Sequence, residues 1–242
     1  MSLVVTTCVP EGIILASDSR QTLTLEVKKG DGSLLDKLNI VNSDFVNKTF
    51  ALKEYEIGIN TFGRDLIKGI PTASYIRQFE ETLLKKDNIE SITKKLLDYF
   101  KKIDSDADIG FHLAGYLKES EVITKKEVSN PHIYLVNIKK NILERKNVNS
   151  KGEILFGANW GGEHDIIAGL LKFGDPNALK IAWEAMNLQD AIDFSTFSIS
   201  TTINTMRFQA RAKTVGGPID VLLITPEEVR WVQKKEFHGG AK

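Results

Sequence analysis

The sequence carries, from residue 12 to residue 20, the stretch Gly-Ile-Ile-Leu-Ala-Ser-Asp-Ser-Arg. It is a β-rich apolar run that ends in a polar triplet, Asp18-Ser19-Arg20. Another apolar run covers residues 3–9, and Pro10-Glu11-Gly12 supplies turn residues between the two runs. We therefore predict a β-hairpin that starts the core close to the amino terminus and places Asp18 at the end of its second strand.

The composition limits the class of protein. The chain has 242 residues, of which 42% are hydrophobic, enough for a sizeable core in a single domain spanning 1–242. Its 32 basic residues equal its 32 acidic ones, so no net field would attract nucleic acid. No apolar run reaches the roughly 18–20 residues of a membrane helix, and the amino-terminal segment lacks the basic region of a secretory signal. We expect a soluble, cytoplasmic protein that binds neither nucleic acid nor membrane.

Cysteine and histidine give no sign of a metal site. Cys8 is the only cysteine, which excludes an internal disulfide and a thiol–metal cluster, and we expect it to pack as a small apolar residue. The histidines lack the spacing of metal ligands and are expected in the core or on the surface: His112, His132, His164 and His238. No metal or organic cofactor is predicted.

The first hundred residues change from strand to helix periodicity. Alternating apolar residues predict strands after the hairpin, at 22–27, 44–52 and 55–61. Helical spacing then predicts one amphipathic helix from Gly63 onward, interrupted at Pro71, and another over residues 91–103.

The second half repeats this order. Strands are predicted at 109–117, 132–138 and 142–148. A Gly-rich turn at residues 157–162 is expected to open a helix, another helix begins after the N-cap Asn187, and strands at 219–225 and 229–235 close the chain. Because strands and helices come in blocks rather than in βαβ alternation, we predict an α+β fold of two sheets packed face to face, with a helix pair outside each.

Three motifs occur in an order that points to one family. They are the stretch at residues 12–20, residues 107–116 followed by 131–136, and the Gly-Gly-x-Ile-Asp element within residues 214–221. Together they resemble the proteasome β-type subunits and their bacterial relatives, which are N-terminal-nucleophile hydrolases, and Thr205-Met206-Arg207 is similar to a stretch of the bacterial ancestral-β group. The resemblance runs the length of the chain and implies a four-layer αββα sandwich of two antiparallel sheets.

The resemblance implies a catalytic site at the amino terminus. Such enzymes use a first residue with a hydroxyl, and its own α-amino group, with a pKa of about 8, takes the proton. The family's Asp lies sixteen residues after that nucleophile, and counting back sixteen from Asp18 reaches Ser2. Removal of Met1 would expose Ser2, whereas Thr6 and Thr7 lie too close to Asp18 for this spacing.

The same resemblance assigns Asp18 the task of stabilising a lysine, whose charge lowers the pKa of the amine and hydroxyl beside it. Lys48, which opens a Lys-Thr-Phe-Ala-Leu strand, is the first choice. Lys37 is the alternative, because the segment between Arg20 and Lys48 is longer than usual for the family. Arg20 is a supporting residue of the Asp-Ser-Arg motif.

Three positions depart from the family pattern. Trp160 stands nearest to a Ser that active subunits carry in a Gly-Ser-Gly turn, and Ala212 and Val215 stand nearest to their Asp and Ser before Gly-Gly. None of these three side chains has the hydroxyl or carboxylate that the family carries at the position. The backbone N–H groups of the Gly-rich turn, at Gly161 and Gly162, remain able to form an oxyanion hole.

These observations leave three functions open. The first is a proteasome-like peptidase or amide hydrolase that uses Ser2 on a peptide or amide substrate. The second is a catalytically inactive ring-forming subunit, although the chain lacks the helix that proteasome α-type subunits carry before the first strand. The third is a small-molecule amidase of the same class. The resemblance also implies a homo-oligomeric ring or spiral, with no unfoldase partner identifiable.

Overall fold

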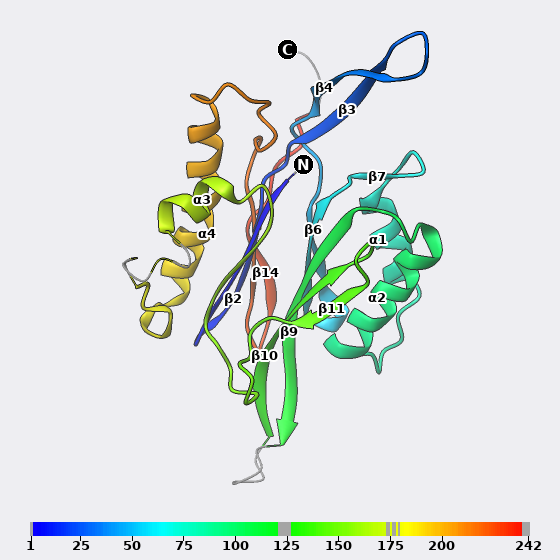
Figure 1. Cartoon of the computed structure of the whole chain (residues 1–242). Helices are drawn as coiled ribbons and strands as arrows, with labels where there is room; N and C mark the ends of the chain where they lie inside the picture. Colours follow the sequence, from blue (N-terminus) through cyan, green and yellow to red (C-terminus); the bar gives the residue numbers. More distant parts are fainter. Residues whose placement is uncertain (1, 121–126, 173–174, 176–177, 179, 239–242) are drawn as a thin grey trace.

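The computed structural model describes residues 2–120, 127–172, 175, 178 and 180–238. Two five-stranded antiparallel sheets form its centre (Figure 1). The first has the order β12-β1-β2-β13-β14, comprising Gly157–Gly162, Leu3–Val9, Gly12–Ser17, Asp220–Ile224 and Val229–Gln233. The second has the order β11-β10-β9-β6-β5, comprising Ile142–Arg145, Glu127–Asn137, Ile109–Ser120, Ile57–Gly63 and Thr49–Leu52.

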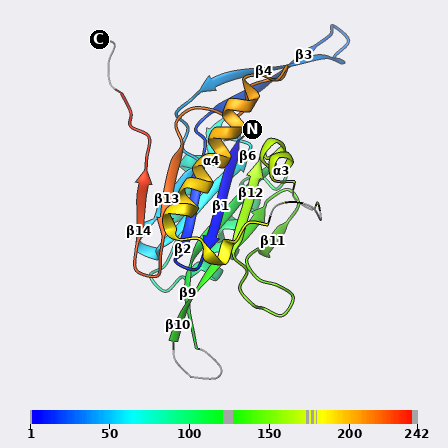
Figure 2. The same ribbon diagram turned by 90° about the vertical axis from the view of Figure 1, so that its left-hand side faces the viewer.

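Helices lie outside both sheets (Figures 1 and 2). The α-helices are α1 (Thr72–Glu80), α2 (Ile89–Ile103), α3 (Asp165–Leu171) and α4 (Leu188–Met206), and 3-10 turns cover Lys53–Tyr55 and Trp183–Ala185. Asn88 and Asn187 each cap a following helix with a capping box, which confirms the helix start predicted at Asn187. The predicted α+β class is confirmed. Within the described residues, no helix has the length and apolarity that crossing a membrane requires.

Three apolar clusters hold these elements together. One lies between the sheets, where Ile13 and Leu15 of β2 meet Ala114 of β9. Another joins α1 and α2 to the second sheet, with Phe100 and Phe111 rings 4.7 Å apart. The last joins α4 to the first sheet. Both faces of each sheet are thus covered, which explains why all residues of β1 and β2 are buried.

The helix predicted from Gly63 is wrong over its first half. Residues 66–71 form two short strands, β7 (Leu66–Ile67) and β8 (Ile70–Pro71), and the helix begins only at Thr72. Lys68 and Gly69 both have positive φ, as a two-residue hairpin turn of the primed type requires. The turn chemistry of Lys68-Gly69 therefore overrides the helical spacing of the neighbouring apolar residues.

The Gly-rich segment at 157–162 is strand β12 rather than the turn that was predicted. It pairs with β1 in the register Leu3↔Gly162, Val4↔Gly161 and Val5↔Trp160. Close packing explains its glycines, since a Cβ on Gly161 would lie 2.4 Å from the Phe62 ring. Glycine has a low strand propensity, but these glycines form a strand because pairing with β12 covers the edge of β1.

A long hairpin projects from the body and was only half predicted. It consists of β3 (Gln21–Lys28) and β4 (Leu34–Ser43), which form a two-stranded sheet of their own (Figures 1 and 2). The sequence pattern predicted the first strand, at 22–27, but no strand over residues 34–43, so β4 was missed. The strand pair predicted at 44–52 and 55–61 corresponds to β5 and β6. This hairpin accounts for the long segment between Arg20 and Lys48.

Candidate active site

The Asp18 carboxylate lies where the end of β2 meets three distant parts of the chain. Its Oδ1 accepts hydrogen bonds from the Leu3 N–H at 3.0 Å and the Lys48 Nζ at 2.8 Å. Its Oδ2 accepts from the N–H groups of Arg20 at 3.1 Å and Gly216 at 3.0 Å. Asp18 is fully buried, so these four donors replace water around its charge. The arrangement fixes Asp18 as a rigid anion.

Lys48 is the fully buried cation beside this anion. Both side chains of the Lys48–Asp18 pair have no exposure. The Lys48 Nζ also donates to the Arg20 carbonyl oxygen at 2.5 Å, and the Lys48 carbonyl accepts from the Thr61 N–H at 2.8 Å. Of the two lysines considered, Lys48 is the one in contact with Asp18, whereas Lys37 lies within β4 of the projecting hairpin.

Two glycines allow the Gly-Gly element to approach this cluster. The Gly216 N–H reaches Asp18, and a Cβ on Gly216 would lie 2.5 Å from the Arg20 guanidinium carbon. Gly217 has φ +75° and leaves no room for a side chain against the Asp44 backbone. The motifs at 12–20 and 214–221, about 200 residues apart, therefore meet at one carboxylate.

Arg20 supports this end of the site through a different partner. Its guanidinium forms a bidentate ion pair with Asp44, at 2.6 and 2.9 Å, and donates to the Lys213 carbonyl at 3.1 Å. Arg20 lowers the pKa of the Asp44 carboxyl by this hydrogen bonding, and Asp44 raises that of Arg20. Sequence reasoning missed Asp44, for which it offered no signal beyond a charged residue near a predicted strand start.

Ser2 adjoins the ion pair along the chain. It precedes Leu3, whose N–H is bonded to Asp18, and the Ser2 carbonyl accepts from the Glu163 N–H at 2.8 Å. Ser2 is fully buried, yet its Oγ has no hydrogen-bond partner among the described residues. Buried hydroxyls normally form hydrogen bonds, so the Ser2 hydroxyl differs from the Asp18 carboxylate nearby, whose oxygens both accept hydrogen bonds.

Gly161 and Gly162 lie on β12, the strand that pairs with β1 next to Ser2. Gly162 has φ +85°, and a Cβ there would lie 1.8 Å from the Ser2 carbonyl oxygen. A side chain at this position would therefore push β12 away from β1. The two supporting glycines are thus strand residues and not a free turn: Gly162 contacts the Ser2 carbonyl, and Gly161 pairs with Val4.

The two threonines of β1 have other partners. Thr6 Oγ1 lies 3.0 Å from Nδ1 of His112, a buried residue of the second sheet. Thr7 Oγ1 lies 2.8 Å from Ser195 Oγ on α4, and Ser195 in turn donates to the Ala191 carbonyl. Both hydroxyls are fully buried in opposite faces of β1. Each hydroxyl is therefore paired inside the core, and the exclusion of Thr6 and Thr7 as nucleophiles stays a prediction.

The three departures from the family pattern fill space with apolar groups. Trp160 pairs with Val5 across the strands, and its ring lies 6.4 Å from that of Phe194 on α4. Val215 is buried against the first sheet, and Ala212 lies half-buried nearby in the chain. Nothing in these side chains supplies a carboxylate or hydroxyl to Ser2.

Asp65 is a charged residue of this region that sequence reasoning missed, because the segment was predicted to be helical. It is half-buried, and desolvation raises the pKa of its carboxyl. Lys48 lowers that pKa and Asp18 raises it by direct charge interaction, so Asp65 lies within electrostatic reach of the buried pair. The signal available in the sequence was an aspartate two residues after Gly63.

The remaining candidates behave as core residues. Cys8 is buried, and burial raises the pKa of its thiol to about 12, which keeps it in the unreactive thiol form. His112 and His132 are buried, which confirms the predicted core histidines among the described residues. Within the described ranges, no three His, Cys, Asp or Glu side chains are grouped as metal ligands.

Comparison with known proteins identifies structural neighbours only. No family model matches the chain, and no curated protein matches it in sequence. Among solved structures, the chain is similar to an Anbu Gly-1 mutant from Hyphomicrobium sp. strain MC1, with a TM-score of 0.60, 13% identity, and coverage of 97% of this chain and 86% of the other. It is also similar to Anbu, the ancestral beta-subunit, from Yersinia bercovieri, with a TM-score of 0.57, 12% identity, and coverage of 96% and 87%.

These neighbours span nearly the whole chain, so the likeness concerns its complete architecture and not one motif. Identities of 12–13% are too low to carry residue roles from one protein to the other. The comparisons therefore establish that this chain shares the fold of Anbu.

Proposed function

We propose that the chain is an N-terminal-nucleophile hydrolase of the proteasome type that cleaves peptide or amide bonds with Ser2. The observation that carries the proposal is the buried Asp18–Lys48 pair, held at the N–H of the residue after Ser2, next to a buried Ser2 hydroxyl without a partner among the described residues. The proposal includes the four-layer αββα sandwich, a cytoplasmic location and assembly into a homo-oligomeric ring or spiral, for which the ancestral beta-subunit named above offers the precedent of a subunit.

The chemistry requires a cut between Met1 and Ser2. In the intact chain the Ser2 nitrogen is an amide and has no basicity. After the cut it is an amine with a pKa of about 8, fixed beside its own hydroxyl, and it takes the proton as Oγ attacks a carbonyl carbon. The nearby Lys48 ammonium favours the deprotonated forms of both groups, while Asp18 keeps that ammonium in place. The same amine then returns the proton to the leaving nitrogen as the C–N bond breaks, and water hydrolyses the resulting ester on Ser2, which frees the acid product and restores the hydroxyl.

Intact-mass spectrometry of the purified protein, followed by an epoxyketone that reacts with hydroxyl nucleophiles, tests the proposal. We expect a mass lacking Met1 and one adduct per chain. The adduct should be lost in Ser2→Ala and kept in Ser2→Thr, which retains a hydroxyl. Quantitative retention of Met1, or equal labelling of Ser2→Ala, would overturn the proposal.

One observation favours a second candidate, a catalytically inactive subunit of the same assembly. By the resemblance, Trp160, Ala212 and Val215 stand where active relatives carry supporting polar groups, and Trp160 and Val215 pack in an apolar cluster. In that case Met1 is removed or retained without consequence, no adduct forms, and the protein still assembles on size exclusion. A small-molecule amidase remains the alternative if labelling succeeds but peptides are not cleaved.

A further inference from the structure

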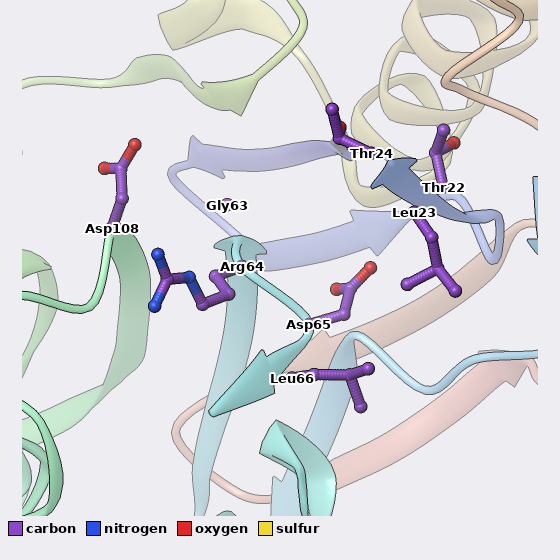
Figure 3. A pocket seen from close by; sticks show the side chains of 8 residues that line it. All are labelled: Thr22, Leu23, Thr24, Gly63, Arg64, Asp65, Leu66 and Asp108. Carbon is purple, nitrogen blue, oxygen red and sulfur yellow. The ribbon is translucent and has the colours of Figure 1, made fainter. Parts of the chain in front are cut away.

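A pocket of about 500 Å³ opens between the base of the projecting hairpin and the segment after β6 (Figure 3). Leu23 of β3 and Leu66 of β7 form apolar parts of its lining. Asp65 lies between them, with its carboxylate directed toward the hairpin (Figure 3). Thr22, Thr24 and Arg64 also line it, so the pocket combines charged and polar groups with apolar side chains.

The pocket lies next to the Asp18–Lys48 ion pair. Thr22, on its hairpin side, is two residues after Arg20, whose carbonyl accepts from Lys48. Asp65, on its other side, interacts with the charges of Lys48 and Asp18. Ser2 precedes Leu3, whose N–H binds the same Asp18, so Ser2 and the pocket both adjoin this ion pair.

The Asp65 carboxylate has no directly bonded partner within the described residues. No hydrogen bond or ion pair engages it there, although it is half-buried. The Lys48 charge stabilises it only from beyond contact distance, and the neighbouring Arg64 pairs with Asp104 at 3.6 Å. A half-buried carboxylate without a directly bonded cation is stabilised further when a cation enters the pocket.

We propose that this pocket receives a lysine or arginine side chain of the substrate, with Asp65 as the selecting carboxylate. The methylene groups of such a side chain pack against Leu23 and Leu66, while its cationic end reaches Asp65. The other pocket acid, Asp108, lies on the far side of Arg64 (Figure 3) and adds to the negative field. The proposal rests on the proposed function for the placement of the peptide.

The test measures peptide binding without cleavage, in the Ser2→Ala background. Fluorescence anisotropy compares two fluorescein-labelled hexapeptides that differ at one position, arginine against its uncharged isostere citrulline. We expect the arginine peptide to bind at least about tenfold more tightly. Asp65→Asn should remove this difference and Asp65→Glu should keep part of it. Asp98→Asn, which alters an exposed carboxylate on α2, should preserve it in full.

Equal affinity for the two peptides, an unchanged difference in Asp65→Asn, or no binding of either up to millimolar concentration would each overturn the proposal. Selective binding in the absence of any Ser2 labelling in the parent protein would overturn the proposed function and leave the basic-side-chain pocket standing. Labelling of Ser2 together with unselective binding would do the reverse.

Discussion

Two buried aspartate–lysine pairs, Asp18–Lys48 and Asp220–Lys235, have the same chemistry and different surroundings. Asp18 receives four hydrogen bonds from residues 3, 20, 48 and 216. Among the described residues, Asp220 receives only the backbone N–H of Lys235, at 2.8 Å, and that residue's Nζ. The first pair joins four parts of the chain beside Ser2, whereas the second ties the segment after β14 to the start of β13. The first arrangement is that of a preorganised site, and the second is that of a clamp.

The two lysines also differ in their electrostatic environment. Burial lowers the pKa of Lys235, and the interactions with Asp220 offset part of this effect. Lys48 adds to the lowering, so the two pairs lie close enough to sense each other's charge. Variants of Lys48 and Lys235 can therefore be compared to separate the effect of losing the site pair from that of losing the clamp pair.

The largest loss of stability is expected from Lys48→Met. It leaves the Asp18 charge in the centre of the molecule, where water cannot reach it, and breaking such a pair costs about 3–5 kcal/mol. Urea unfolding followed by circular dichroism gives the free energy of unfolding. A cost below about 1 kcal/mol would show that the three backbone N–H donors suffice for Asp18.

A smaller loss is expected from Lys235→Met. Lys235 follows the last strand, so the end segment can detach and let water reach Asp220, which limits the cost to about 1–3 kcal/mol. The same urea titration measures it. If this variant is less stable than Lys48→Met, the clamp contributes more to the fold than the site does.

His112 adds a buried ionisable group without a counter-ion. Burial first, and the charge of Lys146 second, lower the pKa of His112 to about 4 in the folded protein, against about 6.5 in the unfolded chain. Between these pH values the histidine takes up a proton only in the unfolded chain. Lowering the pH from 6.5 to 4 therefore decreases the free energy of unfolding, by up to about 1.4 kcal/mol per pH unit. In His112→Gln this loss between pH 6.5 and 4 should shrink, which unfolding measured across that range would reveal. An unchanged pH dependence would contradict it.

The smallest effect is expected from Thr7→Val, which removes one hydrogen bond to Ser195 and costs about 1 kcal/mol. Epoxyketone labelling of this variant should match that of the parent protein. Loss of labelling with the fold intact would move the nucleophile from Ser2 to the threonine pair of β1.

Much of the fold was predictable because its strongest signals are local. The first hairpin, the amphipathic α2 and the Asn187 cap all follow from periodicity and capping chemistry. The errors occur where local chemistry or distant pairing prevails over periodicity. The Lys68-Gly69 turn interrupts a helical pattern, and β12 is a strand only because β1 pairs with it.

The site was predictable to a similar extent and for a different reason. Asp18 and Lys48 came from a family resemblance, and the structure places them in contact. Asp44 and Asp65 were not predictable, since their importance arises from partners brought near by the long β3–β4 hairpin and the β6 end. The role of Ser2 stays a prediction.

The rate of epoxyketone labelling in Lys48→Met and Lys235→Met, at equal folded fraction by circular dichroism, tests the central comparison most directly. We expect labelling of Ser2 to fall by at least about a hundredfold in Lys48→Met, because the hydroxyl and amine lose the adjacent charge. In Lys235→Met we expect a change of no more than about a few fold. Equal labelling rates in the two variants would contradict the assignment of Asp18–Lys48 to catalysis.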